Sequence, residues 1–274
     1  MKNFHSIKVL TYNILAQHLV NKLEGNVPDD KFLQWNFRLN NIINLVKQKD
    51  VDIICFQEID NTKDIYFKDL KKKMEELGYE GKKTTDNDKT KKKLECAIFF
   101  KKYINFINKV KHKSRTCNIK LNIKGIDIRI VSLHCDGGTG KSWNEKLPLR
   151  DTHINKLIKD KLYDDTNVII CGVFNESPKT ILDRGDKRLL NNPKYKFQKV
   201  IFPPHATVIN RNYLTFNCPS SQVDHIFYRG NIELVNINEM TKEELNGISK
   251  GIPNEKYGSD HLPLICEFLL SKEF

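Results

Sequence analysis

The sequence predicts an α/β fold, and three observations indicate it. Short apolar runs, typical of buried strands, recur along the whole chain. Segments with a helical hydrophobic period separate several of these runs. No Pro-, Ser- or Gly-rich linker divides the 274 residues, so we expect residues 1–274 to form a single domain.

The N-terminal part predicts a strand and then a helix. The strand is expected at Ile7–Tyr12 and is followed by Asn13. Apolar residues recur with a period near 3.6 from Phe32 to Val46, which predicts a helix. Asp29 or Asp30, in the Pro28-Asp29-Asp30 segment before it, can cap the N-terminus of this helix.

The next part predicts a second strand and helix followed by a polar loop. The strand Val51–Phe56 leads directly into Gln57-Glu58. A helix from Thr62 to Leu77 should end at Gly78. Residues 82–93 are almost free of apolar side chains, so we expect a mobile loop there.

Three further strands and a helix are expected in the middle of the chain. Strands at Cys96–Phe100 and Cys117–Ile123 precede a strand at Ile126–Leu133, which ends at His134. A helix is expected around Arg150–Leu162, with its apolar residues facing inward.

The stretch Asn167–Asn175 is the most informative one. Val168 to Cys171 predicts a strand that is buried on both faces. Gly172 allows a sharp turn, and Asn175 follows just past the strand end. Val173 is unexpected, because this β-branched aliphatic residue occupies a position suited to a charged side chain.

Two later runs also carry ionisable residues. Val223–Tyr228 contains Asp224, and Ser259-Asp260-His261 precedes the apolar stretch Leu262–Leu270. His225 should face the opposite side of its strand from Asp224, so we leave it out of the site. Because several predicted strands each have a polar residue at one end, we expect one shared site.

The charge favours an anionic partner. The net charge is +12 and the pI is about 9.2. The alternative is that the lysines simply form a solvated surface, and any single lysine cluster can be explained in this way.

The remaining composition predicts a soluble, intracellular protein. The seven cysteines form no C-x-x-C pair and lie mostly in apolar runs, which indicates buried reduced thiols and excludes a zinc or disulfide framework. No apolar run approaches the roughly 18 residues of a membrane span, and no leader-like segment opens the chain. We expect no membrane partner and a cytoplasmic location, with the nucleus as the alternative.

One motif suggests a nucleotide site and is rejected. Gly140-Lys141-Ser142 is similar to the end of a phosphate-binding P-loop, but the position of the required first glycine is occupied by Cys135. No helical pattern starts directly after Ser142, so an ATPase is not expected.

The strand-end residues suit the cleavage of a phosphodiester. Mg²⁺ is usually held by one or two carboxylates together with the substrate phosphate, and Glu58 is the best candidate ligand. Asn13 and Asn175 can orient phosphate oxygens without adding negative charge. His261, oriented by Asp224, can stabilise the charge that develops on phosphorus.

These motifs occur in a known order. The chain resembles the endonuclease/exonuclease/phosphatase superfamily of metal-dependent phosphodiesterases, most closely its deadenylase and nocturnin branch of RNA 3′-exonucleases. The resemblance covers residues 7 to 268 and is carried by Thr11-Tyr12-Asn13-Ile14-Leu15-Ala16, Trp35 with Arg38, Asp52 to Glu58, Ser132-Leu133-His134, Gly172-Val173-Phe174-Asn175, Val223-Asp224, Ile252-Pro253-Asn254 and Ser259-Asp260-His261-Leu262-Pro263-Leu264.

The resemblance implies a four-layer α/β sandwich, in which two mixed β-sheets pack face to face and are flanked by helices. It places Mg²⁺, or Mn²⁺, on Glu58, with Asn13 and Asp260 nearby. It assigns phosphate contacts to His134, Asn175 and His261.

The resemblance also implies three supporting residues. Asp224 is expected to orient His261. Phe216 is expected to stack on a nucleobase, with ordinary core packing as the alternative. Arg38 is a candidate substrate-binding residue, and its alternative is a surface position with the charge in water.

One departure from the family matters most. Where the family has Gly-Asp-Phe-Asn, this chain has Gly172-Val173-Phe174-Asn175. The family's Asp positions or deprotonates the attacking water, which valine cannot do. The loss of a general base commonly costs about 10²–10⁴-fold in rate.

The expected function is therefore a Mg²⁺-dependent phosphodiesterase, a 3′–5′ exoribonuclease of deadenylase type that is nearly inactive in this form. RNA is favoured over DNA as the partner. One alternative is a tyrosyl-DNA phosphodiesterase-like or abasic-site DNA nuclease. The other is a non-catalytic nucleic-acid-binding pseudoenzyme, which is disfavoured because the other site residues are all present.

Overall fold

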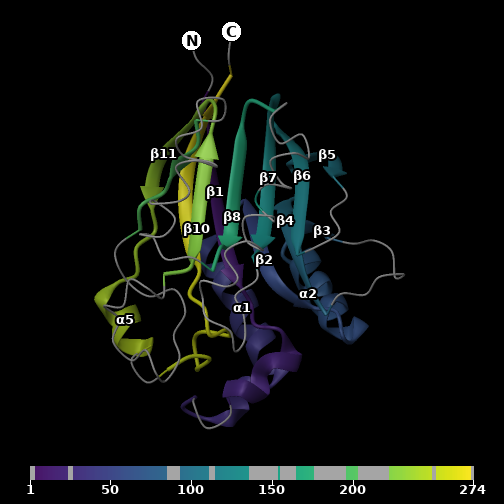
Figure 1. Ribbon diagram of the computed structural model, residues 1–274, viewed down its shortest axis with the longest axis vertical. Helices are drawn as coiled ribbons and strands as arrows, with labels where there is room; N and C mark the ends of the chain where they lie inside the picture. Colours follow the sequence, from purple (N-terminus) through teal and green to yellow (C-terminus); the bar gives the residue numbers. More distant parts are fainter. Residues whose placement is uncertain are drawn as a thin grey trace.

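Two mixed six-stranded sheets form the centre of the molecule (Figure 1). The computed structural model describes residues 4–23, 27–84, 93–110, 115–135, 154, 165–175, 196–202, 222–248 and 251–272. The molecule is an α/β sandwich, as the sequence predicts. Its division into a single domain over 1–274 stays a prediction.

The first sheet, sheet A, has the strand order β11-β12-β1-β2-β4-β3. Only β1 and β2 in it are parallel, and the other neighbours are antiparallel. Its strands are β1 (Phe4–Asn13), β2 (Ile53–Asp60), β3 (Tyr79–Lys83), β4 (Leu94–Lys101), β11 (Ile232–Ile237) and β12 (Leu264–Ser271).

The second sheet, sheet B, has the order β5-β6-β7-β8-β10-β9. Its one parallel pair is β7 with β8. Its strands are β5 (Asn105–Val110), β6 (Thr116–Ile123), β7 (Ile126–His134), β8 (Val168–Val173), β9 (Gln198–Lys199) and β10 (Asp224–Arg229).

The two sheets bury a common apolar layer between them. Inward-facing residues such as Val9 of β1, Cys55 of β2, Ile130 of β7 and Cys171 of β8 belong to one hydrophobic cluster. Because side chains alternate along a strand, residues two positions further on face the same layer. Asn13, Gln57, His134 and Val173 therefore lie at one end of the space between the sheets.

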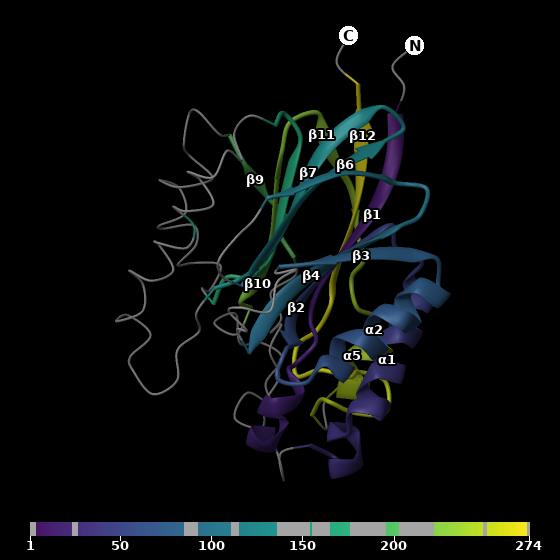
Figure 2. The ribbon, with the colours of Figure 1, turned by 90° about the vertical axis from the view of Figure 1, so that its right-hand side faces the viewer.

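Helices cover the outer face of sheet A (Figure 2). α1 (Trp35–Lys49), α2 (Asp64–Glu76) and α5 (Lys242–Ile248) contribute residues to a second hydrophobic cluster with the outward-facing side chains of β1, β2 and β4. Each Å² of apolar surface removed from water contributes about 25 cal/mol to the free energy of folding. This layer is therefore a main source of stability. Two short 3₁₀ helices, η1 (Gln17–Leu23) and η2 (Asp30–Leu33), precede α1.

The outer face of sheet B carries a smaller described cluster. Val131, Phe174 and Phe227 pack there with Ile154, the one described residue of the helix expected around Arg150–Leu162. The rest of that helix lies outside the described residues.

Two local expectations were wrong. The expected helix from Phe32 to Val46 is split, because Gln34 is extended and ends η2 before α1 begins at Trp35. The polar run 82–93 was expected to be a loop, but Lys82 and Lys83 belong to β3 and pair with β4. Backbone pairing with an already buried strand outweighs the low intrinsic strand propensity of lysine. Residues 85–92 lie outside the described residues.

Within the described residues, none of the helices combines the length and the apolar character needed to cross a membrane.

Candidate active site

Polar side chains from both sheets meet at one end of the inter-sheet layer. The parallel strands of each sheet end there, at Asn13 of β1 and His134 of β7. The antiparallel strand β10 begins there with Asp224. The topology thus gathers residues that are far apart in sequence.

A continuous series of contacts joins five residues at this end. Asp224 Oδ2 lies 2.9 Å from His261 Nδ1, and His261 Nε2 lies 3.2 Å from Asn13 Nδ2. Asn13 Nδ2 also donates to Glu58 Oε1 at 3.1 Å. His134 Nε2 lies 3.7 Å from the same Glu58 oxygen. The structure brings these five residues together at one end of the sheets, and their assignment as a catalytic site stays a prediction.

The backbone around Glu58 aims its carboxylate into this cluster. Glu58 has a φ of 57°, and the pairing of β2 with β4 shifts register between Phe56 and Ile59. A non-glycine residue in this left-handed region costs on the order of 1 kcal/mol, and such strain is often found at functional sites. The Ala16 N–H donates to Glu58 Oε2 at 3.1 Å and fixes the second oxygen.

Asn13 and His261 are held by hydrogen bonds from the backbone and from Ser259. The Leu15 N–H donates to Asn13 Oδ1 at 2.9 Å. The Ser259 hydroxyl donates to the Asn13 carbonyl at 2.6 Å and accepts from the His261 N–H at 3.2 Å. Ser259 therefore links the loop before β12 to the end of β1.

Glu58 is the anionic centre of the site. Burial would raise the pKa of its carboxyl, but the imidazoles of His134 and His261 and the hydrogen bonds from Asn13 and Ala16 outweigh burial and lower this pKa. Glu58 is therefore ionised at neutral pH.

The two imidazoles differ in charge. Burial lowers the pKa of His134 to about 4, and the neighbouring Glu58 offsets this only in part. Burial also opposes the charged form of His261, but the Asp224 carboxylate outweighs it and raises the pKa of His261 to about 9. At neutral pH the site combines a neutral and a protonated imidazole.

This charge difference affects the contact between His261 and Asn13. Nδ2 of Asn13 is a donor, so Nε2 of His261 accepts from it only when the imidazole is neutral. In the protonated form, Nε2–H is instead left to donate to an oxygen of a ligand.

Asp260 lies next to this cluster. Burial raises the pKa of its carboxyl, and the negative charge of Glu58 adds to this effect. The protonated His261 and the Arg38 guanidinium act in the opposite direction. Two carboxyls therefore share one region, and an added cation would favour the ionised form of both.

Val173 lies between two members of the cluster. In the strand register its partners are His134 on β7 and Asp224 on β10. Cross-strand partners project to the same face of a sheet, so the Val173 side chain stands beside that imidazole and that carboxylate. It is buried, with 1% of its surface exposed. An aliphatic group thus occupies a central position of an otherwise polar site.

Asn175 lies at the edge of the cluster. Its φ is 54°, and its side-chain Nδ2 donates to the Cys135 carbonyl at 2.6 Å. Cys135 follows His134 directly, so this bond fixes Asn175 beside the end of β7. The Nδ2 group carries a second hydrogen, which can be donated to an oxygen of a ligand.

The expectations for Arg38 need correction. Its side chain is fully buried, so neither a surface position nor a direct substrate contact fits. Its guanidinium instead makes four hydrogen bonds, to the carbonyls of Ile14, Leu15 and Gly258 and to Gln17 Oε1. Arg38 holds the loop after β1 against the loop before His261. Phe216, the other predicted substrate contact, lies outside the described residues.

A hydrogen-bonded bridge between the two sheets lies beneath the site and was not predicted from the sequence. Gln57 is fully buried, and its Nε2 lies within 3.0 Å of Thr11 Oγ1 and 2.9 Å of Ser132 Oγ. Ser132 Oγ in turn donates to the Phe56 carbonyl across the sheets at 3.2 Å. The available signal was positional, since Thr11 and Ser132 each lie two residues before a site residue on the same strand face.

The donor set at Glu58 fits a hard cation such as Mg²⁺. Glu58 is ionised, and each of its oxygens accepts one hydrogen bond from the protein, which leaves further lone pairs. Among the described residues, no three His, Cys, Asp or Glu side chains group closely enough to hold a metal ion alone. Mg²⁺ typically takes only one or two carboxylates and keeps several waters, so this donor set is compatible with it.

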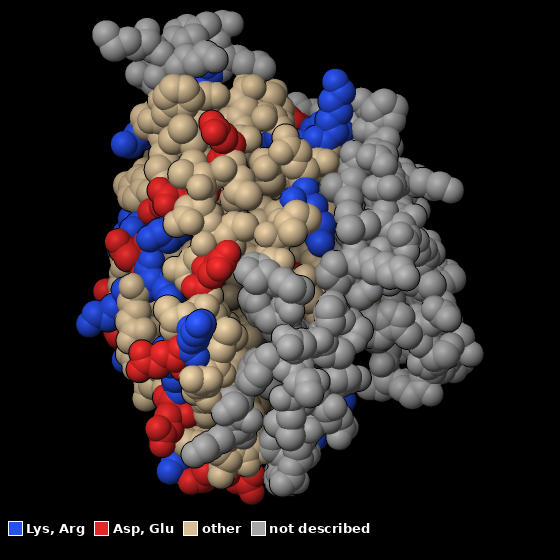
Figure 3. All heavy atoms as spheres, turned by 90° about the vertical axis from the view of Figure 1, so that its left-hand side faces the viewer, with Lys and Arg blue, Asp and Glu red and all other residues tan. Residues whose placement is uncertain are grey.

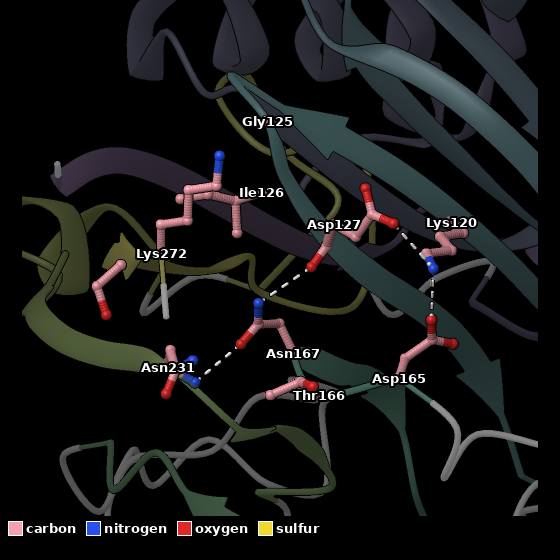
Figure 4. A pocket seen from close by; sticks show the side chains of 10 residues that line it. Lys120, Gly125, Ile126, Asp127, Asp165, Thr166, Asn167, Asn231 and Lys272 are labelled. Carbon is pink, nitrogen blue, oxygen red and sulfur yellow. Dashed lines mark hydrogen bonds and ion pairs between the residues drawn. The ribbon is translucent and has the colours of Figure 1, made fainter. Parts of the chain in front are cut away.

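A separate pocket of about 250 Å³ lies at the opposite end of the sheets (Figure 4). Lys120 there contacts the carboxylates of Asp127 at 3.0 Å and Asp165 at 2.9 Å. Asn167 donates to the Asp127 carbonyl and accepts from the Asn231 N–H. These groups satisfy one another, so the pocket offers no evident binding chemistry.

Comparison with known proteins identifies the family of the chain. A model of the Endonuclease/Exonuclease/phosphatase family matches residues 10–261. The chain belongs to this family. The match runs from the end of β1 to His261 and thus spans every member of the polar cluster.

Individual relatives are more distant. The chain is 24% identical over 331 residues to the Saccharomyces cerevisiae CCR4-Not complex 3′-5′-exoribonuclease subunit Ccr4, covering 96% of this chain and 39% of Ccr4. It is 25% identical over 295 residues to nocturnin of Rattus norvegicus, covering 97% of this chain and 66% of nocturnin. The chain thus spans less than two thirds of either relative.

A solved structure supports the fold. ANGEL2, a 2′,3′-cyclic phosphatase crystallised with adenosine-2′,3′-vanadate, superposes with a TM-score of 0.71 at 21% identity, over 98% of this chain and 99% of that one. This likeness establishes the fold alone, and the reaction of this chain must be argued from its own residues.

Proposed function

We propose that this chain is a metal-dependent phosphodiesterase site of the 3′–5′ exoribonuclease type, nearly inactive because of Val173. The observation that most strongly supports this proposal is the series of contacts from Asp224 through His261 and Asn13 to Glu58, with Val173 beside it. The relative named as the 3′-5′-exoribonuclease subunit Ccr4 favours RNA as the substrate over DNA.

Glu58 and Asn13, with Asp260 nearby, would hold Mg²⁺ or Mn²⁺. A divalent ion bound there would neutralise phosphate charge and stabilise the leaving oxygen. The lowered pKa of Glu58 supports this assignment, because a carboxylate ligand must be ionised. Burial raises the pKa of Asp260, and a bound cation would act in the opposite direction.

The imidazoles would bind the phosphate. His261, protonated at neutral pH, donates through Nε2 to a non-bridging oxygen while Asp224 accepts from Nδ1. His134 stays neutral and adds no positive charge. Asn175 borders the same end of β8 and would contact the phosphate without adding a charge.

Val173 removes the base from this arrangement. A carboxylate at this position would face the same space as His134 and Asp224 and could orient or deprotonate the attacking water. The valine side chain cannot accept a proton or a hydrogen bond from the attacking water. Binding of metal and RNA should therefore persist, while the turnover rate falls by about 10²–10⁴-fold. The retention of the other site residues favours an otherwise competent site over a long-inactive one.

The charge of the chain is compatible with a nucleic-acid partner. The net charge is +12. On the described part of the face in Figure 3, however, acidic and basic side chains are interspersed with large neutral areas. The excess charge therefore does not mark this face as the binding surface. A cytoplasmic or nuclear location stays a prediction.

A substrate panel tests the proposal. The Val173→Asp variant is incubated with Mg²⁺ and labelled oligo(A), mixed RNA, an abasic duplex and tyrosyl-linked DNA. We expect release of mononucleotides from the 3′ end of RNA. Preferential cleavage of the abasic or tyrosyl substrate would favour the DNA-processing alternatives. No cleavage of any RNA or DNA would contradict the chemistry proposed.

The non-catalytic alternative makes a different prediction. A nucleic-acid-binding pseudoenzyme would bind RNA with a steep dependence on salt and would stay inactive after Val173→Asp. Binding isotherms at several salt concentrations, measured beside the cleavage assay, separate the two functions.

A further inference from the structure

A second imidazole–carboxylate pair lies next to the site. The segment that leads from β1 into η1 runs along the end of β2, where the Ala16 N–H donates to Glu58 and the His18 N–H donates to Asp60 Oδ2 at 2.8 Å. His18, the second residue of η1, therefore lies two residues after the residue that fixes Glu58. None of the roles proposed above uses this pair.

Asp60 fixes the His18 ring. Its carboxylate accepts four hydrogen bonds, from the backbone N–H and Nδ1 of His18 and from the N–H and hydroxyl of Thr62. The Nδ1 contact is 3.0 Å long. The Asp60 side chain is only 2% exposed, whereas that of His18 is 23% exposed. The ring is thus anchored on its Nδ1 side and partly accessible to solvent.

The free ring atom is Nε2. Among the described residues no hydrogen bond to His18 Nε2 occurs, while Nδ1 is committed to Asp60. The same division of roles holds for His261, whose Nδ1 contacts Asp224 and whose Nε2 faces the site. If His18 served only to hold the loop, the Nδ1 contact alone would be sufficient.

The surrounding charge indicates what Nε2 can bind. The Glu58 and Asp60 carboxylates lie two residues apart on β2, and a phosphate brought to His18 would meet both negative charges. A hydroxyl group is uncharged, and it both donates and accepts. It therefore pairs with Nε2 in either protonation state of the ring.

We infer that His18 Nε2 contacts a ribose 2′-hydroxyl of a strand bound at Glu58, and that this contact favours RNA over DNA. The inference rests on the proposed function and names the residue that would impose its RNA preference. The 2′-hydroxyl is the group by which a protein distinguishes RNA from DNA at a given position.

The His18→Asn variant tests this contact. The asparagine amide nitrogen can take the place of Nδ1 and keep the bond to Asp60, but it provides no group at the position of Nε2. His18→Gln is the matched variant, because its longer amide reaches toward the Nε2 position. Dissociation constants are measured by fluorescence anisotropy with oligo(A) and oligo(dA) of equal length in Mg²⁺, using the natural Val173 chain so that cleavage does not interfere.

We expect the natural chain to bind oligo(A) more tightly than oligo(dA). His18→Asn should weaken RNA binding by roughly three- to tenfold, the equivalent of one hydrogen bond, and leave DNA binding and the melting temperature unchanged. His18→Gln should recover part of the RNA preference.

Three outcomes would overturn the inference: equal losses on RNA and DNA, no loss on RNA, or no RNA preference in the natural chain. Equal losses would point to a phosphate contact instead. The outcome for the proposed function is separate, because an inactive Val173→Asp variant would reject hydrolysis while a His18-dependent RNA preference would still stand.

Discussion

His261 Nδ1 lies 2.9 Å from Asp224 Oδ2, although the two residues are 37 positions apart and belong to different structural elements. The contact joins the loop before β12 of sheet A to β10 of sheet B. It determines both the charge of the imidazole and its orientation toward Asn13 and Glu58. The chemistry of the site therefore depends on the relative placement of the two sheets.

The first prediction concerns pH and stability. The folded-state pKa of His261 is about 9, above its ordinary value of 6.5. Its contribution to stability should be complete below pH 6.5 and should be lost as the pH rises through 9. A shift of this size corresponds to at most roughly 3 kcal/mol. Urea unfolding of the natural chain and of Asp224→Asn should give a difference that narrows between pH 6.5 and 9.

An independent measurement checks the same pair. In a histidine NMR titration, the His261 pKa should fall well below 9 in Asp224→Asn. An unchanged His261 titration in this variant would contradict the assigned cause.

The second prediction concerns the carboxylate that Val173 replaces. Val173→Asp should melt at a lower temperature than the natural chain in the absence of metal, because the new charge faces Asp224. Two like charges about 5 Å apart repel by roughly 3 kcal/mol at an effective dielectric of 20. Mg²⁺ should recover part of the difference.

Val173→Asn is the matched control, since it adds polarity and similar volume without charge. It should show a smaller loss, and Mg²⁺ should raise its melting temperature only as much as that of the natural chain, so that its difference from the natural chain does not narrow. An equal effect of Mg²⁺ on both variants would place the cation away from position 173.

The third prediction concerns metal binding. The melting temperature of the natural chain should rise by a few degrees in Mg²⁺ or Mn²⁺, at roughly 2–4 °C per kcal/mol of binding energy. Glu58→Gln should abolish this rise, because the neutral amide cannot replace the ionised ligand. Asp127→Asn, in the pocket at the opposite end of the sheets, serves as the control and should retain it. A full metal response in Glu58→Gln would reject Glu58 as the ligand.

The fourth prediction concerns Arg38. Arg38→Met should lower the free energy of unfolding by at least about 3 kcal/mol, because four acceptors lose their buried donor. Lys71→Met, at an exposed position of α2, should change it by less than about 0.5 kcal/mol. Weaker RNA binding without any loss of stability would instead support the substrate contact that the sequence suggested.

Much of the fold could be predicted from local patterns. The apolar runs at Ile7–Tyr12 and Ile126–Leu133 became β1 and β7 with shifts of a few residues at the ends, because buried strands carry a strong hydrophobic signal. The four edge strands β3, β5, β9 and β11 were missed. β5 and β11 carry exposed apolar residues such as Ile107 and Val235, so no regular alternation marks them.

The site was predictable only in part. Asn13, Glu58 and His134 follow buried strands, and that position is visible in the sequence. The role of Arg38 could not be predicted, because nothing in a helical pattern shows that three carbonyls from two distant loops converge on one guanidinium. The His18–Asp60 pair was missed for the same reason, since it arises where η1 packs along the end of β2.

The most direct test of the account is the single-turnover rate of cleavage of 3′-labelled oligo(A) by Val173→Asp in Mg²⁺. We predict a rate about 10²–10⁴-fold above that of the natural chain, and a loss of this gain when Glu58→Gln is added. A rate equal to that of the natural chain, in a variant that is folded and binds RNA, would contradict the assignment of this site to phosphodiester hydrolysis.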